Sequence, residues 1–273
     1  MSATAVGVLL EPAPIGQTFV AARSPFRWLL EREVLRYLRI WRYSLIGPVL
    51  STSLFVLVFG TVLSRHVEGL GSTTYGLFIL PGLVVQAVVN VGYYNGTTSL
   101  YEARRDRYLH CVLASPLRWW EINAALVLAA VLRGVLVSGA VLAVAAPLTG
   151  VSIQRPTYLV AAAPAILVVA AQVGIIAGAV ANSLDHVYSV ESLVLLPLGF
   201  LGGIFYPVAQ LPGGWQVVSE LNPFYWLVQA GRVGFLGHAD APGWAALVVV
   251  WLLAGALTAW SAAIFARGRR FRP

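Results

Sequence analysis

The sequence contains no lysine, and all 18 of its basic residues are arginines. The phosphate-binding loop of P-loop ATPases needs a lysine, in the pattern GxxxxGK followed by Ser or Thr. This chain therefore cannot hydrolyse ATP by that route. Charge of either sign is also scarce, at 11% of residues, against about 25% in soluble domains. Most of the chain is thus expected to face something other than water.

Catalytic and metal-binding patterns are missing as well. The single cysteine, Cys111, excludes an internal disulfide framework. The four histidines lack metal-ligand spacing, and no HxxxH, GxSxG or DxxxD pattern occurs. We expect no catalytic residue, no metal site and no cofactor on this chain. The first 23 residues have no basic segment followed by an apolar core, so they do not form a signal peptide; we expect a short disordered lead.

Long apolar stretches dominate the rest of the chain. A membrane-spanning helix needs about 20 mostly apolar residues. Six stretches qualify, at 44–64, 77–99, 121–147, 157–181, 189–206 and 243–266. The sequence predicts an all-α integral membrane protein with six transmembrane helices in one domain, 44–266.

The arginines indicate how these spans are oriented. Fourteen lie before the first span, between the second and third, and after the sixth, whereas only three lie in the loops of the other side. Cytoplasmic loops of membrane proteins are enriched in basic residues. Both termini, including the basic tail 267–273, are therefore expected in the cytoplasm. This placement also makes nucleic acid an unlikely partner despite the net charge of +7.

Residues 24–43 have the pattern of an amphipathic helix. Ser24 and Pro25 suit a helix start. One face is formed by Phe26, Leu30, Val34, Tyr37 and Trp41, and another by Arg32, Arg36 and Arg39. The spacing predicts a helix lying on the cytoplasmic membrane surface, with its arginines toward lipid phosphates. A helix packed on a soluble domain is the alternative.

The loop after the second span is long and charged, and reads LYEARRDRYLHCVLASPLRWWEI from Leu100. Glu102 with Arg105, and Asp106 with His110, have the spacing of helical ion pairs. We interpret this loop as a short helix that docks on a cytoplasmic partner; a plain basic loop is the alternative. Asp185 and His186, in the turn NSLDHVYS, could touch the same partner or belong to a simple connection.

The segment FLGGIFYPVAQLPGGWQVVSELNPFYW, from Phe200, is interrupted by glycine and proline four times. Its breaks predict short helices near 207–212, 213–221 and from Asn222 to Phe235. Irregular backbone is tolerated at membrane depth only when it is buried in protein or lines a cavity. We predict re-entrant helices over about 207–235, dipping into the outer leaflet. A loop resting on the membrane surface is the alternative.

A few polar side chains fall inside the predicted spans. Arg133 needs a partner or water, and Glu191 is a candidate partner; a structural pair and a substrate contact both remain possible. Gln86, Asn90 and Tyr94 share a helix face that lines a path or contacts another helix. Gly174 and Gly178 permit a close helix approach.

The interrupted segment resembles the signature of ABC-2 type permeases, the membrane subunits of ABC exporters for drugs, lipids, lipo-oligosaccharides and polysaccharides. The resemblance rests on Pro197, GGIFYP at 202–207, Leu211, Pro212, Trp215, Asn222, Pro223, Tyr225 and Arg232. LASPL at 113–117 and Arg133-Gly134 are similar to the drug and nodulation-factor branch, and the likeness covers roughly residues 25–270. Where the family often has leucine after the Asn-Pro pair, this chain has Phe224.

This resemblance implies partners and roles. It implies a second permease subunit, as a homodimer or heterodimer, and two cytoplasmic ATPase subunits that bind ATP and magnesium. The implied ATPase-coupling residues are Glu102, Arg104, Arg105, Asp106, Arg107, His110, Asp185 and His186. The implied outer-gate residues are Gly202, Gly203, Phe205, Tyr206, Pro207, Leu211, Pro212, Asn222, Pro223 and Tyr225. The resemblance also implies that an amphipathic drug, lipid, glycolipid or polysaccharide moves outward across a bacterial inner membrane.

Two other classes of function remain as rivals. An ion-coupled secondary transporter would need several ionisable groups within the membrane, and Arg133 and Glu191 are few. Such transporters often contain inverted repeats, but the two halves of this chain do not match in their broken positions. A lipid-modifying membrane enzyme would need a polar catalytic cluster, which the sequence lacks.

Overall fold

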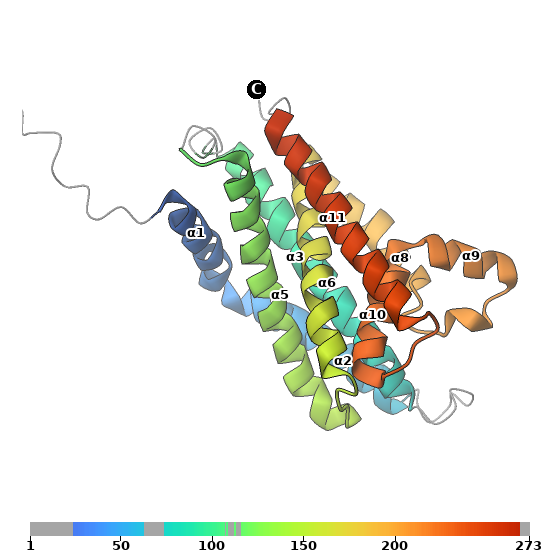
Figure 1. The fold of residues 1–273 in the computed structure, drawn as a ribbon. Helices are drawn as coiled ribbons and strands as arrows, with labels where there is room; N and C mark the ends of the chain where they lie inside the picture. Colours follow the sequence, from blue (N-terminus) through green and yellow to red (C-terminus); the bar gives the residue numbers. More distant parts are fainter. Residues whose placement is uncertain (1–23, 63–73, 107, 109–111, 113–115, 268–273) are drawn as a thin grey trace, which may run out of the picture.

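The computed structural model of the chain describes residues 24–62, 74–106, 108, 112 and 116–267 (Figure 1). All regular structure in these residues is helical, as predicted. Six helical segments are long and apolar enough to cross a membrane: Arg42–Gly60, Tyr75–Arg105, Trp119–Thr149, Pro156–Val180, Leu184–Leu201 and Gly243–Ala266. The predicted number and order of spans are confirmed. The predicted lead 1–23 and residues 268–273 of the tail lie outside the described residues.

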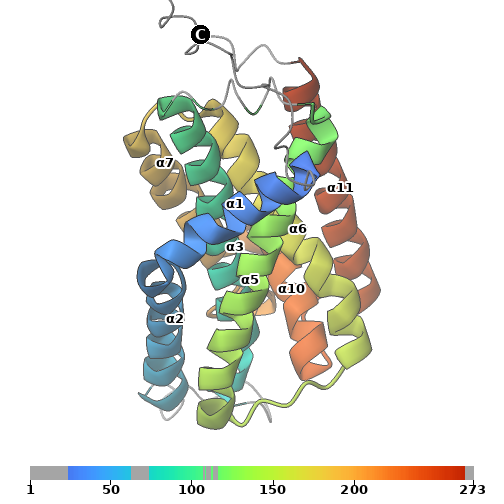
Figure 2. The same cartoon turned by 90° about the vertical axis from the view of Figure 1, so that its left-hand side faces the viewer.

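Helix α3 (Tyr75–Arg105) is the centre of the bundle. It packs against α5 (Trp119–Thr149), α6 (Pro156–Val180) and α10 (Pro223–Leu236), and these helices run side by side in Figure 2. Most of its side chains are buried. A helix that is apolar on all sides is expected in such a core position. The end where α3 finishes and α5 begins carries Arg104, Arg105 and Arg118, and we call it the basic end.

Glycines bring α3 and α6 into backbone contact. A Cβ added to Gly92 would lie 2.7 Å from Cβ of Ala170, and one on Gly178 would lie 2.8 Å from Cα of Thr97. Without side chains at these positions the two helix backbones approach closely, as small residues allow in membrane helices. The close approach predicted from Gly174 and Gly178 is confirmed.

Helix α1 (Pro25–Arg39) begins directly after Ser24, as predicted, and crosses α5 obliquely (Figure 2). Its buried face is formed by Leu29, Glu33 and Tyr37. The predicted apolar face is therefore rotated, and Trp41 is exposed. As a result the Glu33 carboxylate faces inward and forms ion pairs with Arg32 and Arg36 of the same helix. The first span follows as η1 (Arg42–Ile46), α2 (Gly47–Leu57) and η2 (Val58–Val62).

The fifth span has boundaries that differ from the prediction. It consists of α7 (Leu184–Val190), the π-helical turn η4 (Glu191–Leu195) and α8 (Leu196–Leu201). The prediction of a turn over 182–189 is wrong for most of its length, because α7 already begins at Leu184. Ser183 caps this helix: its hydroxyl accepts a hydrogen bond from the backbone N–H of His186 at 3.1 Å. The π turn precedes Pro197, which lacks the N–H that an α-helix would use.

The interrupted segment divides where the sequence predicted. It contains η5 (Val208–Gln210), α9 (Gly213–Leu221) and α10, and the chain then enters α11 (Gly243–Arg267). Helix α10 is buried among α3, α6 and α11, so it is not a surface loop. Helix α9 projects sideways from the bundle in Figure 1, with Leu221 79% exposed. The depth of this segment in the membrane stays a prediction.

Candidate transport path and coupling surface

A stripe of polar, partly exposed residues interrupts the otherwise buried surface of α3. From Ile79 to Leu100 every residue of α3 is buried except Gln86, Asn90, Tyr94 and Thr98, which are half-buried. These four residues recur at four-residue spacing and define the polar stripe. Gln86 donates a hydrogen bond from Nε2 to Oδ1 of Asn90 at 3.0 Å. Polar groups in a membrane helix rarely face lipid, so the stripe marks a face that meets protein or water.

The fifth span lies along this stripe. The amide of Gln86 fills the space beside Gly199, where a Cβ would lie 3.1 Å from its Cδ. Two turns nearer the basic end, Tyr94 donates a hydrogen bond to the Glu191 carboxylate. Tyr93 anchors the same region, since its hydroxyl donates to the carbonyl of Val187 at 2.7 Å. The structure thus brings together three of the four predicted intramembrane polar residues.

The fourth residue, Arg133, lies apart from Glu191. Its guanidinium donates to the carbonyl of Ser44 at 3.1 Å and contacts Oδ1 of Asn95 at 3.5 Å. It also lies 5.8 Å from the ring centroid of Tyr37. Arg133 therefore joins α5 to α1, η1 and α3, which favours a role in helix packing. The sequence could not reveal this arrangement, because a long side chain reaches partners on several helices.

At the basic end, Arg104 joins the two predicted coupling regions. It donates hydrogen bonds to the carbonyls of Gly178 at 2.5 Å, Ala179 at 3.4 Å, and Ala181. These carbonyls end α6, just before the turn into α7, and the last carbonyls of a helix have no partner within it. Arg104 therefore points inward and fixes α3 to the α6–α7 turn instead of facing solvent.

The exposed charges of this end lie next to Arg104. Arg105 forms an ion pair with Asp106 at 2.8 Å, and its side chain is 54% exposed. The hydrogen bond from Arg105 lowers the pKa of the Asp106 carboxyl. Asp185 and His186 are exposed in the first turn of α7. The other two predicted coupling residues, Arg107 and His110, lie outside the described residues.

A buried carboxylate connects α1 to this region. Glu33 is fully buried; it contacts Arg32 at 2.6 Å and Arg36 at 3.2 Å, and accepts a hydrogen bond from Ser99 at 2.8 Å. Arg36 in turn reaches Glu102 at 3.6 Å. The predicted pair of Glu102 with Arg105 is therefore replaced by a pair between helices.

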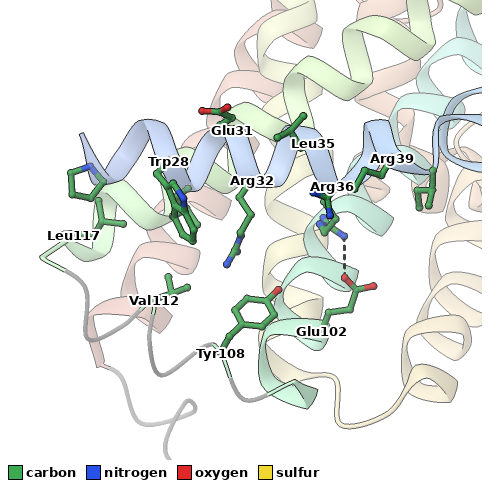
Figure 3. A pocket seen from close by; sticks show the side chains of 13 residues that line it. Trp28, Glu31, Arg32, Leu35, Arg36, Arg39, Glu102, Tyr108, Val112 and Leu117 are labelled. Carbon is green, nitrogen blue, oxygen red and sulfur yellow. Dashed lines mark ion pairs between the residues drawn. The ribbon is translucent and has the colours of Figure 1, made fainter. Parts of the chain in front are cut away.

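A groove of about 930 Å³ lies between α1 and the side chains of Glu102, Tyr108, Val112 and Leu117 (Figure 3). Figure 3 shows Arg32 pointing from α1 toward Tyr108, and the two groups are 4.7 Å apart, guanidinium carbon to ring centroid. Trp28, Val112 and Leu117 supply apolar walls. Burial raises the pKa of Tyr108. The groove is charge-balanced, because Arg32 and Arg36 both contact carboxylates.

The predicted outer-gate residues gather where α8 meets α10. Asn222 caps α10: its Oδ1 accepts from the N–H of Phe224 at 2.9 Å, while its Nδ2 donates to the carbonyl of Leu198 at 2.6 Å. Tyr75 donates to the carbonyl of Phe205 at 3.0 Å. Gly203 has φ +74°, which a side chain would strain. The remaining predicted gate residues, Gly202, Tyr206, Pro207, Leu211, Pro212, Pro223 and Tyr225, lie in the same connected segment.

An arginine at the centre of this segment holds it together. Arg232 is 2% exposed, donates to the carbonyl of Gly203 at 2.5 Å and lies 3.6 Å from Asp240. Asp240 also accepts from the N–H of Val208 at 3.2 Å. The guanidinium carbon is 3.8 Å from the ring centroid of Phe78. This network connects α10 to α3 and to both flanking loops.

Comparison with known proteins identifies the family. Residues 24–236 match the ABC-2 type transporter family. The chain belongs to the ABC-2 type transporter family. It is 32% identical to Inner membrane transport permease YadH of Escherichia coli (strain K12) over 245 residues, 88% of this chain and 94% of that protein.

Further relatives of this ABC-2 family member are named for drug resistance and for nodulation. Daunorubicin resistance ABC transporter permease protein DrrB1 of Streptomyces coeruleorubidus is 29% identical over 217 residues, covering 76% of this chain and 72% of that protein. Nodulation protein J of Neorhizobium galegae is 23% identical over 208 residues, covering 76% and 79%. The chain is thus a multi-pass membrane protein related to transport permeases.

Sequence reasoning missed three groups in this ABC-2 chain. Glu33 interrupts an apolar face of α1, and a carboxylate at such a position could have indicated a buried ion pair. Asp240 and Tyr188 offered no pattern, because Asp240 meets Arg232 across a loop and Tyr188 meets Tyr94 of another helix. Across the described residues, no group of three or more His, Cys, Asp or Glu side chains could hold a metal ion.

The inward position of Arg104 leads to a prediction. Arg104→Ala should destabilise the purified chain by about 2 kcal/mol, because the α6 carbonyls lose charge-assisted hydrogen bonds. Arg105→Ala is the matched control: its ion pair with Asp106 is exposed and screened by solvent, so its loss should change stability little. Thermal unfolding in detergent measures both, and equal unfolding temperatures for the two variants would contradict the bridging role of Arg104.

Proposed function

We propose that this ABC-2 family member is the membrane subunit of an exporter, driven by ATP that a separate cytoplasmic ATPase binds with magnesium and hydrolyses. The exporter moves an amphipathic drug, lipid or glycolipid outward. Relatives named for daunorubicin resistance and for nodulation support this substrate range. The permease itself carries no catalytic residue in this proposal.

The continuity of α3 is the observation that carries the proposal. One helix of 31 residues runs from Tyr75 to Arg105 without a break, a length of about 46 Å at about 1.5 Å per residue. It carries the polar stripe in its middle and ends at the exposed pair of Arg105 and Asp106. A displacement at that pair therefore moves the stripe, and Arg104 transmits it to α7 as well.

A second copy of the chain completes the path. The polar stripe is half-exposed, and most side chains of the adjacent fifth span are exposed, including Leu193 and Phe200. Half-exposed polar groups are costly against lipid. A homodimer that places two such faces together encloses the stripes, with the segment 202–225 as the outer gate. The buried network around Arg232 keeps that gate in one piece.

The membrane boundaries follow the arginines. The basic end and both termini lie in the cytoplasm, across a bacterial inner membrane. Helix α1 lies at the cytoplasmic surface, where its exposed Trp28 and Ile40 meet lipid and Arg39 meets phosphate groups.

Co-purification with an ATPase tests the proposal. The tagged chain, expressed with the ATPase encoded beside it, should elute with that ATPase in equal amounts. Arg105→Glu should reduce co-purification and ATP turnover about tenfold, because it reverses the charge at the exposed end of α3. Arg155→Glu makes the same charge change on an exposed arginine at the opposite end and should leave both unchanged.

Two outcomes would contradict the proposal. Equal behaviour of the Arg105 and Arg155 variants would remove the basic end as the ATPase contact. A chain that purifies alone and moves substrate along an ion gradient in proteoliposomes would instead be a secondary transporter.

A further inference from the structure

Glu191 is the one acidic side chain of the six spans that lies away from a span end. It is seven residues after Leu184 and ten before Leu201. The other carboxylates in the spans, Glu102, Glu121 and Asp185, lie within three residues of an end. A carboxylate at such a depth is expensive and by default indicates a functional site.

No cation neutralises Glu191 among the described residues. Its carboxylate accepts a hydrogen bond from Tyr94, and no described arginine or histidine forms an ion pair with it. Arg133 is occupied by Ser44 and Asn95. The negative charge therefore lies beside the polar stripe with only a hydroxyl as its partner.

Tyr94, which donates to this carboxylate, lies between two further tyrosine rings. The ring centroids of Tyr93 and Tyr94 are 5.7 Å apart in an edge-to-face arrangement, and those of Tyr94 and Tyr188 are 6.3 Å apart. Tyr188 precedes Glu191 by three residues, so both lie on one face of the helix. We call these four residues the acidic tyrosine cluster. Tyrosine faces attract cations, most strongly away from water.

The cluster is both preformed and open. The hydrogen bond from Tyr93 to the Val187 carbonyl, 2.7 Å, holds α7 against α3. Tyr188 is 53% exposed, and Glu191 and Tyr94 are half-buried, so a ligand can reach them. Glu191 opens the π turn η4, and π turns within helices are frequent at functional sites. The cluster lies about two turns inside the basic end.

We propose that the acidic tyrosine cluster binds an organic cation, so that the substrates of the exporter are amphipathic amines or quaternary cations. Glu191 supplies the opposite charge, Tyr94 and Tyr188 supply ring faces, and Asn90 and Gln86 continue the polar surface toward the opposite end. Amphipathic anions are rejected by the same carboxylate. This inference rests on the proposed export function for its meaning in the cell, but the binding site itself does not.

Two ions of matched size and opposite charge test the site. The full-length chain in phosphatidylcholine nanodiscs is titrated calorimetrically with tetraphenylphosphonium and with tetraphenylborate, and each titration is corrected with empty nanodiscs. Glu191→Gln keeps a hydrogen-bond acceptor for Tyr94 and removes only the charge. We expect this variant to bind tetraphenylphosphonium about tenfold more weakly and tetraphenylborate no more weakly. Tyr188→Leu should also weaken binding of the cation severalfold.

Glu220→Gln is the matched control, because it removes one carboxylate from the exposed α9 and should change neither titration. Equal cation affinity in wild type and Glu191→Gln would overturn the site, as would tighter binding of the anion by the wild type. Because the titration needs no ATP, a Glu191-dependent cation signal in a chain that recruits no ATPase would refute the export function and leave the site standing. A working ATPase complex without that signal would refute the site alone.

Discussion

The variant Glu33→Ala is expected to lose about 3 kcal/mol of stability, because it removes the buried carboxylate that pairs with both Arg32 and Arg36. Glu33 is fully buried, and Arg32 and Arg36 are each less than a third exposed. Removing the carboxylate takes from Arg32, which is partly desolvated, its carboxylate partner, and leaves Arg36 with the longer 3.6 Å contact to Glu102. Ser99 also loses its acceptor. Helix α1 should detach from α3, and ATPase coupling should fall with it.

Thermal unfolding of the detergent-purified chain measures this effect. Glu33→Gln keeps an acceptor for Ser99 and should lie between the alanine variant and wild type. Glu31→Gln removes an exposed carboxylate of the same helix and should shift the unfolding temperature little. If Glu33→Ala unfolds at the same temperature as Glu31→Gln, the buried pair does not hold α1.

Gly174→Ala should destabilise the chain by about 3 kcal/mol, because the added methyl group would meet backbone atoms that cannot rotate away. Its Cβ would lie 2.6 Å from the carbonyl oxygen of Gly92 and against that of Tyr93. Helices α3 and α6 would have to separate along their shared length. The polar stripe and the end held by Arg104 both depend on that contact.

Gly139→Ala provides a control of opposite sign. It makes the same substitution within α5, where an added Cβ meets nothing within 4 Å. Alanine favours a helix over glycine by about 1 kcal/mol, so this variant should be slightly stabilised. Unfolding temperatures that move in the same direction for both variants would refute the close-packing argument.

Local chemistry explains what was predictable about this chain. Each membrane span is apolar over its own length, so the six spans could be found without knowing their neighbours. The Gly-Gly and Asn-Pro breaks interrupt a helix through their own backbone chemistry: α9 runs from Gly213 to just before Asn222, and α10 begins at Pro223. The predicted start of the fifth span was wrong, because Ser183 caps a helix that begins at Leu184 and includes the polar residues Asp185 and His186.

Partners of long side chains were decided by the tertiary structure. Glu102 pairs with Arg36 across helices, and Arg133 contacts Ser44 and Asn95 instead of Glu191. An arginine side chain is long enough to reach partners on several neighbouring helices. The choice depends on how each helix is rotated about its axis, which sequence spacing does not specify.

The sequence by itself determined the spans, their order, the segmented outer region and the placement of Gln86, Asn90 and Tyr94 on one helix face. Which face of α3 stays partly exposed was set by tertiary packing, because the glycines of α6 fix how α3 is rotated against it. Packing also brings Glu191 to Tyr94, with no ion pair to an arginine of the described residues. Hydropathy is a property of each segment, whereas an ionic partner is a property of the packed bundle.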